Sequence, residues 1–130
     1  MTYTFTINGN HENIFANPVP YFRTTQGSKF SDGALRYAEW KSYVQKCFET
    51  QNDLKPVLGK PITLTKTQTA EMHIFIGWAD NTHGDCDNVY KGIADALFKN
   101  DKQLTKGSFD SIKSKGKGYV KVTITIHEHT

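Results

Sequence analysis

The chain has 130 residues, of which 37% are hydrophobic and 12% aromatic, so it can bury one core but has little room for two domains. Charged residues make up 22%, which argues against a wholly disordered chain, and no apolar run is long enough to cross a membrane. Two cysteines without a Cys-x-x-Cys pair exclude a disulfide framework, and no signal-peptide pattern is visible. We therefore expect a single domain over residues 1–130 in a soluble, cytoplasmic protein.

The N-terminal half of the sequence predicts a strand, a loop and a helix. In residues 2–7, aromatic and aliphatic side chains alternate with threonines, which is typical of a strand with one buried face. Residues 17–31 are rich in Pro, Gly, Thr and Ser and predict an extended loop. Residues 34–50 follow helix-starting residues and carry an apolar stripe at helical spacing, which predicts a helix.

The C-terminal half predicts a central strand, a second helix and two final strands. Residues 70–78 alternate strongly, and Ile62 with Leu64 favours a short strand before them. Residues 88–98 predict a helix with apolar residues four apart. Residues 108–114 and 120–126 predict two strands joined as a hairpin by a Gly-rich turn. The order strand, helix, strand, helix, strand, strand predicts an α+β domain with helices packed against a mixed sheet.

The basic residues are unevenly distributed. Lys and Arg outnumber Asp and Glu by 16 to 13, which alone is a weak indication of nucleic-acid binding. Residues 99–121, however, hold seven lysines and only two acids. Such a segment suits contacts with phosphates, although a solvated, lysine-rich loop accounts for the composition slightly better.

Two acids stand where the central strand has ended and the second helix begins. In an extended segment, Asp85 and Asp87 place their carboxylates on the same side. Hard divalent cations prefer such oxygen ligands, whose charge compensates that of the ion. Either acid could instead be a helix N-cap, and for the isolated pair this structural interpretation is favoured over a metal site.

The second helix continues this polar pattern. Asp87, Lys91 and Asp95 are four residues apart and share one face, opposite the apolar face. Lys91 therefore lies one turn from the paired carboxylates, and a third acid, Asp101, follows the helix. Asp95 either orients Lys91 or forms an ordinary pair with it on the helix surface.

The motifs follow one another in a recognisable order. They run Asp85-Cys86-Asp87-Asn88, then Lys91, then Asp95-Ala96-Leu97, then Asn100-Asp101-Lys102-Gln103. A lysine-bearing strand, a Gly-rich turn and an alternating strand follow. This order resembles the RusA family of Holliday-junction endonucleases, which is common in phages and prophages. The resemblance covers about residues 69–127, and the loop with Pro20, Arg23 and Gly27 fits it more loosely.

The resemblance implies an Mg²⁺-dependent endodeoxyribonuclease, with Mn²⁺ as a substitute metal, in the cytoplasm of a bacterial host. It would act as a homodimer on four-way junctions and other branched DNA, in recombination and repair. The family's metal ligands fall on Asp85, Asp87 and Asp101, and its catalytic lysine falls on Lys91. We expect phosphate contacts from Arg23, Lys106, Lys113, Lys115 and Lys117. The alternatives are a non-catalytic nucleic-acid-binding module and a phage interaction protein.

Overall fold

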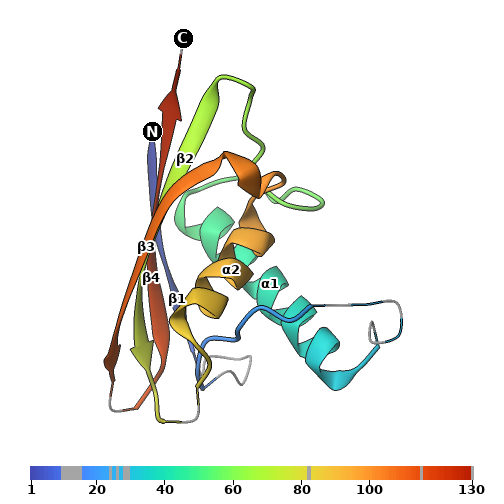
Figure 1. Cartoon of the computed structure of the whole chain (residues 1–130), viewed down its shortest axis with the longest axis vertical. Coiled ribbons are helices and arrows are strands. Elements are labelled where there is room, and N and C mark those ends of the chain that lie inside the picture. The colour runs from blue at the N-terminus through green and yellow to red at the C-terminus, as the bar shows by residue number, and fades with distance from the viewer. Residues whose placement is uncertain are drawn as a thin grey trace.

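The computed structural model describes residues 1–9, 16–23, 25, 27, 30–81, 83–114 and 116–129. Within these ranges, four strands and two α-helices follow one another in the predicted order (Figure 1). They are β1 (Thr2–Asn8), α1 (Asp32–Gln51), β2 (Gln68–Trp78), α2 (Cys86–Leu97), β3 (Leu104–Lys113) and β4 (Tyr119–Glu128), with a short 3-10 helix, η1 (Asp101–Gln103), before β3. The α+β prediction is therefore confirmed.

The strands form one mixed sheet in the order β1-β4-β2-β3. β4 pairs antiparallel with both β1 and β2, whereas β3 runs parallel to β2 on its other side. The predicted hairpin of the last two strands is therefore wrong. Its Gly-rich turn chemistry is local, but burial decides the pairing: β4 contributes the buried Val120, Val122 and Ile124 and lies inside the sheet, while the polar β3 lies at its edge.

A second difference concerns the connector after α1. The short strand predicted at Ile62 and Leu64 is reduced to one isolated parallel bridge between Ile62 and Phe98. The backbone N–H of Ile62 donates to Leu97 O at 2.8 Å, and that of Lys99 donates to Ile62 O at 2.9 Å. The connector is thereby attached to the end of α2, close to the point where η1 begins.

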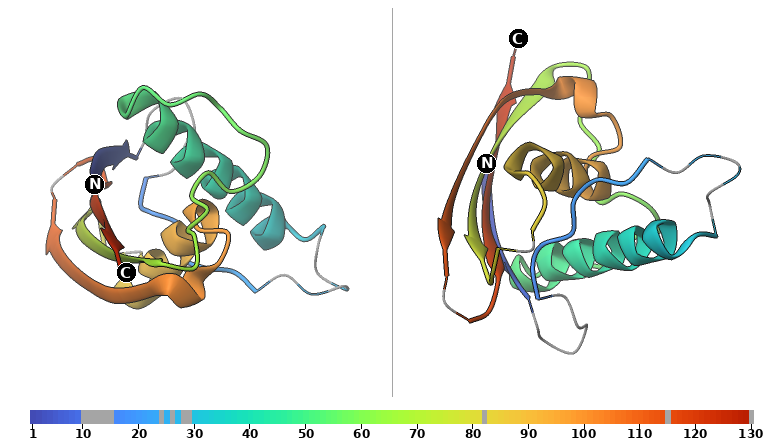
Figure 2. Two further views of the ribbon diagram at one scale, coloured as in Figure 1. Left: turned by 90° about the horizontal axis from the view of Figure 1, so that it is seen from above. Right: turned by 60° about the horizontal axis from the view of Figure 1, so that its bottom comes forward.

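Both helices pack on the same face of the sheet, and the described residues leave the opposite face uncovered (Figure 2). On α2, Val89, Ile93 and Leu97 are fully buried, as their four-residue spacing predicts. On α1, Trp40 and Phe48 are buried in the same core. The polar face of α2 is consequently turned away from the sheet, which leaves it free to carry chemistry.

The loop after β1 is attached to the region where α2 begins. Asn17 is buried, and its side chain accepts from Ala79 N at 2.6 Å and donates to Asp80 at 2.9 Å. Further along, Tyr21 N donates to Asn88 O in the first turn of α2 at 2.8 Å. This loop therefore lies against the first turn of α2.

Two compositional expectations can be compared with the structure. Cys47 and Cys86 are both free thiols, in agreement with the expected lack of a disulfide framework. Neither helix in the described part of the chain combines the length and the apolar character that crossing a bilayer requires.

Candidate functional site

Asp85 and Asp87 stand at the start of α2, after the chain has left the end of β2. Asp85 is the N-cap residue, with φ −82° and ψ 147°, and Asp87 lies in the first helical turn. Both are exposed, and among the described residues neither carboxylate has an ion-pair or hydrogen-bond partner. The two side chains are therefore available to a ligand, at a helix end whose dipole stabilises negative charge.

Asp85 occupies the N-cap position of α2, but its side chain does not cap the helix. The side chain of Asp85 makes no capping hydrogen bond. At the start of α1, by contrast, the hydroxyl of Ser31 accepts from Ala34 N at 3.2 Å. Capping thus does not occupy the Asp85 carboxylate, which leaves the metal interpretation open.

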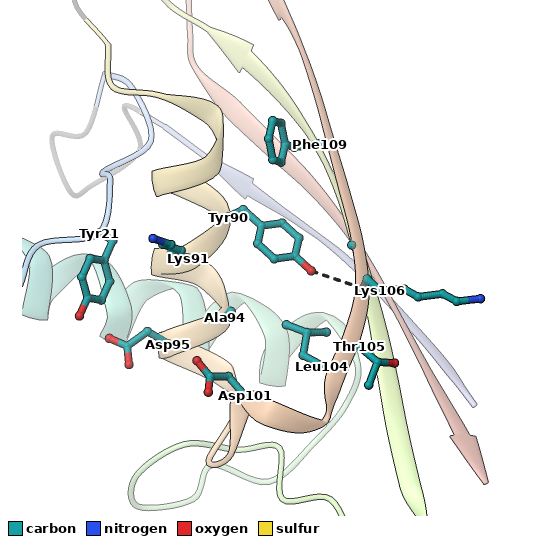
Figure 3. Close-up of a pocket in the computed structure, with 11 residues that line it drawn as sticks. Tyr21, Tyr90, Lys91, Ala94, Asp95, Asp101, Leu104, Thr105, Lys106 and Phe109 are labelled. Carbon is teal, nitrogen blue, oxygen red and sulfur yellow. Dashed lines mark hydrogen bonds between the residues drawn. The ribbon is translucent and has the colours of Figure 1, made fainter. Parts of the chain in front are cut away.

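The central part of α2 borders a cleft of about 570 Å³ that separates this helix from β3. Lys91 and Asp95 reach the cleft from α2, Asp101 reaches it from η1, and Tyr21 reaches it from the N-terminal loop (Figure 3). Lys91 is exposed and extends toward Tyr21. Lys91 also lies one turn beyond Asp87, so it is positioned between the acids at the helix start and the cleft.

Asp101 is the first residue of η1, three residues after α2 has ended. Its neighbour Asn100 caps this short helix, accepting from Lys102 N at 3.2 Å. The Asp101 carboxylate points into the cleft near Asp95 (Figure 3). A helix of 12 residues is about 18 Å long, so Asp101 lies beyond the opposite end of α2 from Asp85.

The structure therefore does not bring the three predicted metal ligands together. In the part of the chain that it describes, no three His, Cys, Asp or Glu side chains form a group that could hold a metal ion. Mg²⁺, however, is commonly held by one or two carboxylates together with water and substrate phosphates. The exposed pair of Asp85 and Asp87 fits that requirement, whereas Asp101 would need to approach from the other end of the helix.

Asp95 has partners that the sequence did not predict. Its carboxylate accepts from Tyr37 Oη at 2.7 Å, Lys60 Nζ at 2.9 Å and Lys41 Nζ at 3.3 Å. Among the described residues, it does not pair with Lys91, so neither sequence-based interpretation of Asp95 is supported. Burial acts to raise the pKa of Asp95, but the bonds from Lys60 and Tyr37 and the lysine charges outweigh it, and the pKa is lowered. This acid is thus committed to joining α2 with α1 and the connector.

Two aromatic rings, Tyr90 from α2 and Phe109 from β3, line the part of the cleft next to β3. The ring of Tyr90 fills the space where a side chain on Gly107 would lie, and its hydroxyl donates to Lys106 O at 3.5 Å. Burial raises the pKa of Tyr90 to about 12, so the hydroxyl keeps its proton at neutral pH. Phe109, which is 46% exposed, lies 6.4 Å from Tyr90 between ring centroids.

The predicted phosphate-binding residues fall into two groups. Lys113 and Lys117 are exposed where β3 ends, and Ser114 N donates to Trp78 O there at 2.7 Å. β2 also ends at this end of the sheet, and the chain continues from there toward Asp85. Arg23 is exposed in the N-terminal loop, whereas Lys115 lies outside the described residues. Lys106 lies near the other end of β3, and its side chain points away from the cleft (Figure 3).

A second polar cluster, which sequence reasoning did not assemble, lies on the uncovered face of the sheet. The Glu71 carboxylate forms hydrogen bonds with Nε2 of His73 at 3.0 Å and Nε2 of His127 at 2.7 Å. The other ring nitrogen of His73, Nδ1, forms a hydrogen bond with Ser108 Oγ at 2.5 Å. The hydrogen bonds from the two imidazoles lower the pKa of Glu71. His73 is thus solvent-facing, and both of its ring nitrogens have hydrogen-bond partners. Its contact with Ser108 depends on the parallel pairing of β2 with β3, which local sequence patterns do not reveal.

In comparisons with known proteins, no family model matches the chain and no curated protein matches it. Function is therefore inferred from the site geometry and from the order of the motifs.

Proposed function

We propose that this chain is an Mg²⁺-dependent endodeoxyribonuclease that cuts branched DNA, above all four-way junctions, in the manner of the RusA family that its motifs resemble. The start of α2 carries the proposal. Asp85 and Asp87 are exposed there, without partners among the described residues, and Lys91 follows one turn later. A metal-binding acid pair and a nearby cation together can relieve the charge that develops when a phosphodiester is hydrolysed.

Asp85 and Asp87 would hold the metal. When bound, Mg²⁺ relieves charge on the phosphate and lowers the pKa of a coordinated water. Lys91 would place its ammonium group where negative charge develops on the phosphate, from a helix whose opposite face is fully packed. The buried Val89 and Ile93 fix the orientation of this helix and hence that of Lys91.

Asp101 would have a lesser role than the two other acids. Its carboxylate faces the same cleft as Lys91 but lies beyond the far end of α2 from Asp85. We propose that Asp101 acts on the substrate or on Lys91 across the cleft. Its replacement should consequently reduce cleavage less than replacement of Asp87 does.

The proposed path of the DNA follows the basic residues. Lys113 and Lys117 lie at the edge of the sheet from which the chain continues to the acid pair, and Lys115 belongs to the same turn in sequence. Arg23 follows Tyr21, whose backbone is bonded to α2. These cations would hold the phosphates beside the metal. Lys106 points away from the cleft near the other end of β3, so we do not place it on this path. Phosphate contacts of this kind supply affinity and position rather than sequence preference.

The proposed assembly is a homodimer. A four-way junction is resolved productively by two symmetrical nicks, and a twofold-symmetric pair of active sites matches that requirement. Each copy would supply one acid pair.

The test is cleavage of a synthetic four-way junction, with a linear duplex of the same sequence beside it. We expect cutting of the junction with Mg²⁺ or Mn²⁺, none with EDTA, and little cutting of the duplex. Asp87→Asn should lower cleavage by about a hundredfold to a thousandfold. Asp32→Asn, which replaces an exposed acid in the first turn of α1, should leave it unchanged. Near-normal cutting by Asp87→Asn would show that the site is misassigned.

One observation favours a second candidate, a non-catalytic nucleic-acid-binding protein. Asp101 lies away from the acid pair, as expected if a former catalytic set no longer works together. Junction binding that survives in Ca²⁺, combined with no cleavage in Mg²⁺ or Mn²⁺, would favour this candidate over the nuclease.

A further inference from the structure

The outer edge of β3 is long and exposed. Residues 105–113 are exposed without interruption, and within the described part of the chain β3 pairs only with β2 (Figures 1 and 2). Two large hydrophobic residues of this strand are also exposed, Phe109 at 46% and Ile112 at 49%. The free backbone groups of such an edge are a template for another strand.

We propose that this edge pairs with the same edge of a second copy, antiparallel, around a twofold axis at Ser108. The two four-stranded sheets would then become one continuous sheet. A twofold axis perpendicular to the sheet places the helix-facing residues of both copies on the same side. Only registers that pair residues of the same face are therefore possible. The charges of β3 select one register among these.

The selected register matches opposite charges on the uncovered face. With Ser108 at the axis, Lys106 of each copy lies opposite Asp110 of the other, and the two pairs are related by symmetry. Moving the axis by one residue places Lys106 opposite Ser108 or opposite Ile112 instead. Opposite charges placed directly across two strands stabilise a sheet, and like charges destabilise it.

The same register also covers one exposed aromatic side chain. On the helix-facing side, Phe109 of one copy lies opposite Gly107 of the other, where the Tyr90 ring already occupies the space above the glycine. Leu104, at the position opposite Ile112, instead faces the helices, because the register shift after Ala70 places it on that side, where it packs against the core. Phe109 is thereby the exposed hydrophobic residue of β3 that acquires a neighbour. The alternative role of Lys106 and Asp110 is to prevent edge pairing, because charges on edge strands commonly do so.

The pairing also explains how two active sites would act together, and this part rests on the proposed function. The cleft beside Lys91 borders β3, so the twofold axis would place one cleft on each side of the seam, the line along which the two β3 strands pair. Both would lie on the same face of the joined sheet. A four-way junction placed over the seam would meet two related sites.

Cysteine cross-linking tests the register directly. In a chain carrying Cys47→Ala and Cys86→Ala, Ser108→Cys should give a disulfide-linked dimer under mild oxidation, because residue 108 faces itself. The matched control is Ser111→Cys, whose two thiols would lie about 20 Å apart at 3.3 Å per residue and should not cross-link. A mixture of Lys106→Cys and Asp110→Cys chains should cross-link, whereas either chain alone should not.

Charge exchange tests the same register without cysteines. In sedimentation of the free protein, Lys106→Asp or Asp110→Lys should raise the dimer dissociation constant about tenfold, because two like-charged pairs form. The chain with both substitutions should return to the original value, since the pairs are opposite again. A monomer at all concentrations, a dimer unaffected by these changes, or cross-linking of Ser111→Cys as strong as that of Ser108→Cys would overturn the proposal. None of these measurements involves DNA or metal, so a failure of the nuclease assignment would be seen separately.

Discussion

The two ends of α2 carry the same chemical group in opposite circumstances. At its start, Asp85 and Asp87 are exposed and have no partner among the described residues. Near its end, Asp95 is held by Tyr37, Lys41 and Lys60. Both sets lie on the polar side of one helix, so helical spacing alone does not separate them. The difference in partners is why we propose ligand binding for the first set, whereas the contacts of the second set join α2 to α1 and the connector.

The sharpest way to break this comparison is Asp87→Asn. We expect cleavage of a four-way junction to fall by about a hundredfold to a thousandfold, a loss of the size seen when a catalytic electrostatic contact is removed. Stability should change by no more than about 1 kcal/mol, the usual contribution of a charge at a helix start. Single-turnover cleavage and urea unfolding of the same preparation measure both. A variant that unfolds easily but cuts normally would invert the assignment.

Lys91→Ala should have the next largest effect. Because Lys91 lies one turn beyond Asp87 and has no carboxylate partner among the described residues, its loss should lower the cleavage rate at saturating enzyme by about a hundredfold. Junction affinity in Ca²⁺ should change little. An unchanged rate with a slightly lower melting temperature would make Lys91 an ordinary surface residue.

Asp95→Ala should chiefly reduce stability. It removes two lysine contacts and leaves the buried Tyr37 hydroxyl without its acceptor, so the free energy of unfolding should fall by about 1–3 kcal/mol. Asp101→Ala is the matched control, because Asp101 is exposed and has no partner among the described residues; its effect should stay within about 0.5 kcal/mol. Urea unfolding curves of the two variants measure this difference.

The same carboxylate predicts a pH dependence. The pKa of Asp95 is lower in the folded chain than its ordinary value, so its stabilisation is present above that value and is lost as the pH falls below about 4. Between pH 6 and pH 3, the stability of the unmodified protein should therefore fall more than that of Asp95→Asn. Parallel pH profiles would contradict this assignment.

The smallest expected effect concerns Lys113 and Lys117. Replacing both with alanine should reduce the slope of log affinity against log salt by about 0.9 for each lost phosphate contact. The cleavage rate at saturating enzyme should remain close to that of the unmodified protein. Affinity measured between low and moderate salt, in Ca²⁺, provides the test. An unchanged slope would leave these lysines as solvated surface.

The sequence predicts local elements well because each depends on residues close together in the chain. The buried face of α2 follows from the spacing of Val89, Ile93 and Leu97, and the order of elements follows from such patterns. The hairpin prediction is wrong because a turn signal does not reveal which strand the core will cover. β4 is rich in buried residues and lies between β1 and β2, so β3 takes the edge.

The candidate site shows the same limit. The acids at the start of α2 could be found from Asp85 and Asp87 alone, because they are two residues apart in the sequence and lie at a helix start that the pattern predicts. The partners of Asp95 could not be found, because Tyr37 and Lys41 come from α1 and Lys60 comes from the connector. The position of Asp101 depends on where α2 ends and η1 begins, which the spacing of residues in the sequence does not specify.

Gly107 also acts as a spacer between a helix and a strand. A methyl group at this position would lie against the Tyr90 hydroxyl, so the ring would have to swing away and its bond to Lys106 O would be lost. Tyr90 is the residue immediately before Lys91, so its displacement would disturb the turn that carries the lysine. The close approach of Tyr90 to β3 thus depends on the missing side chain of Gly107. A larger residue at this position of the strand would therefore alter how α2 packs beside β3.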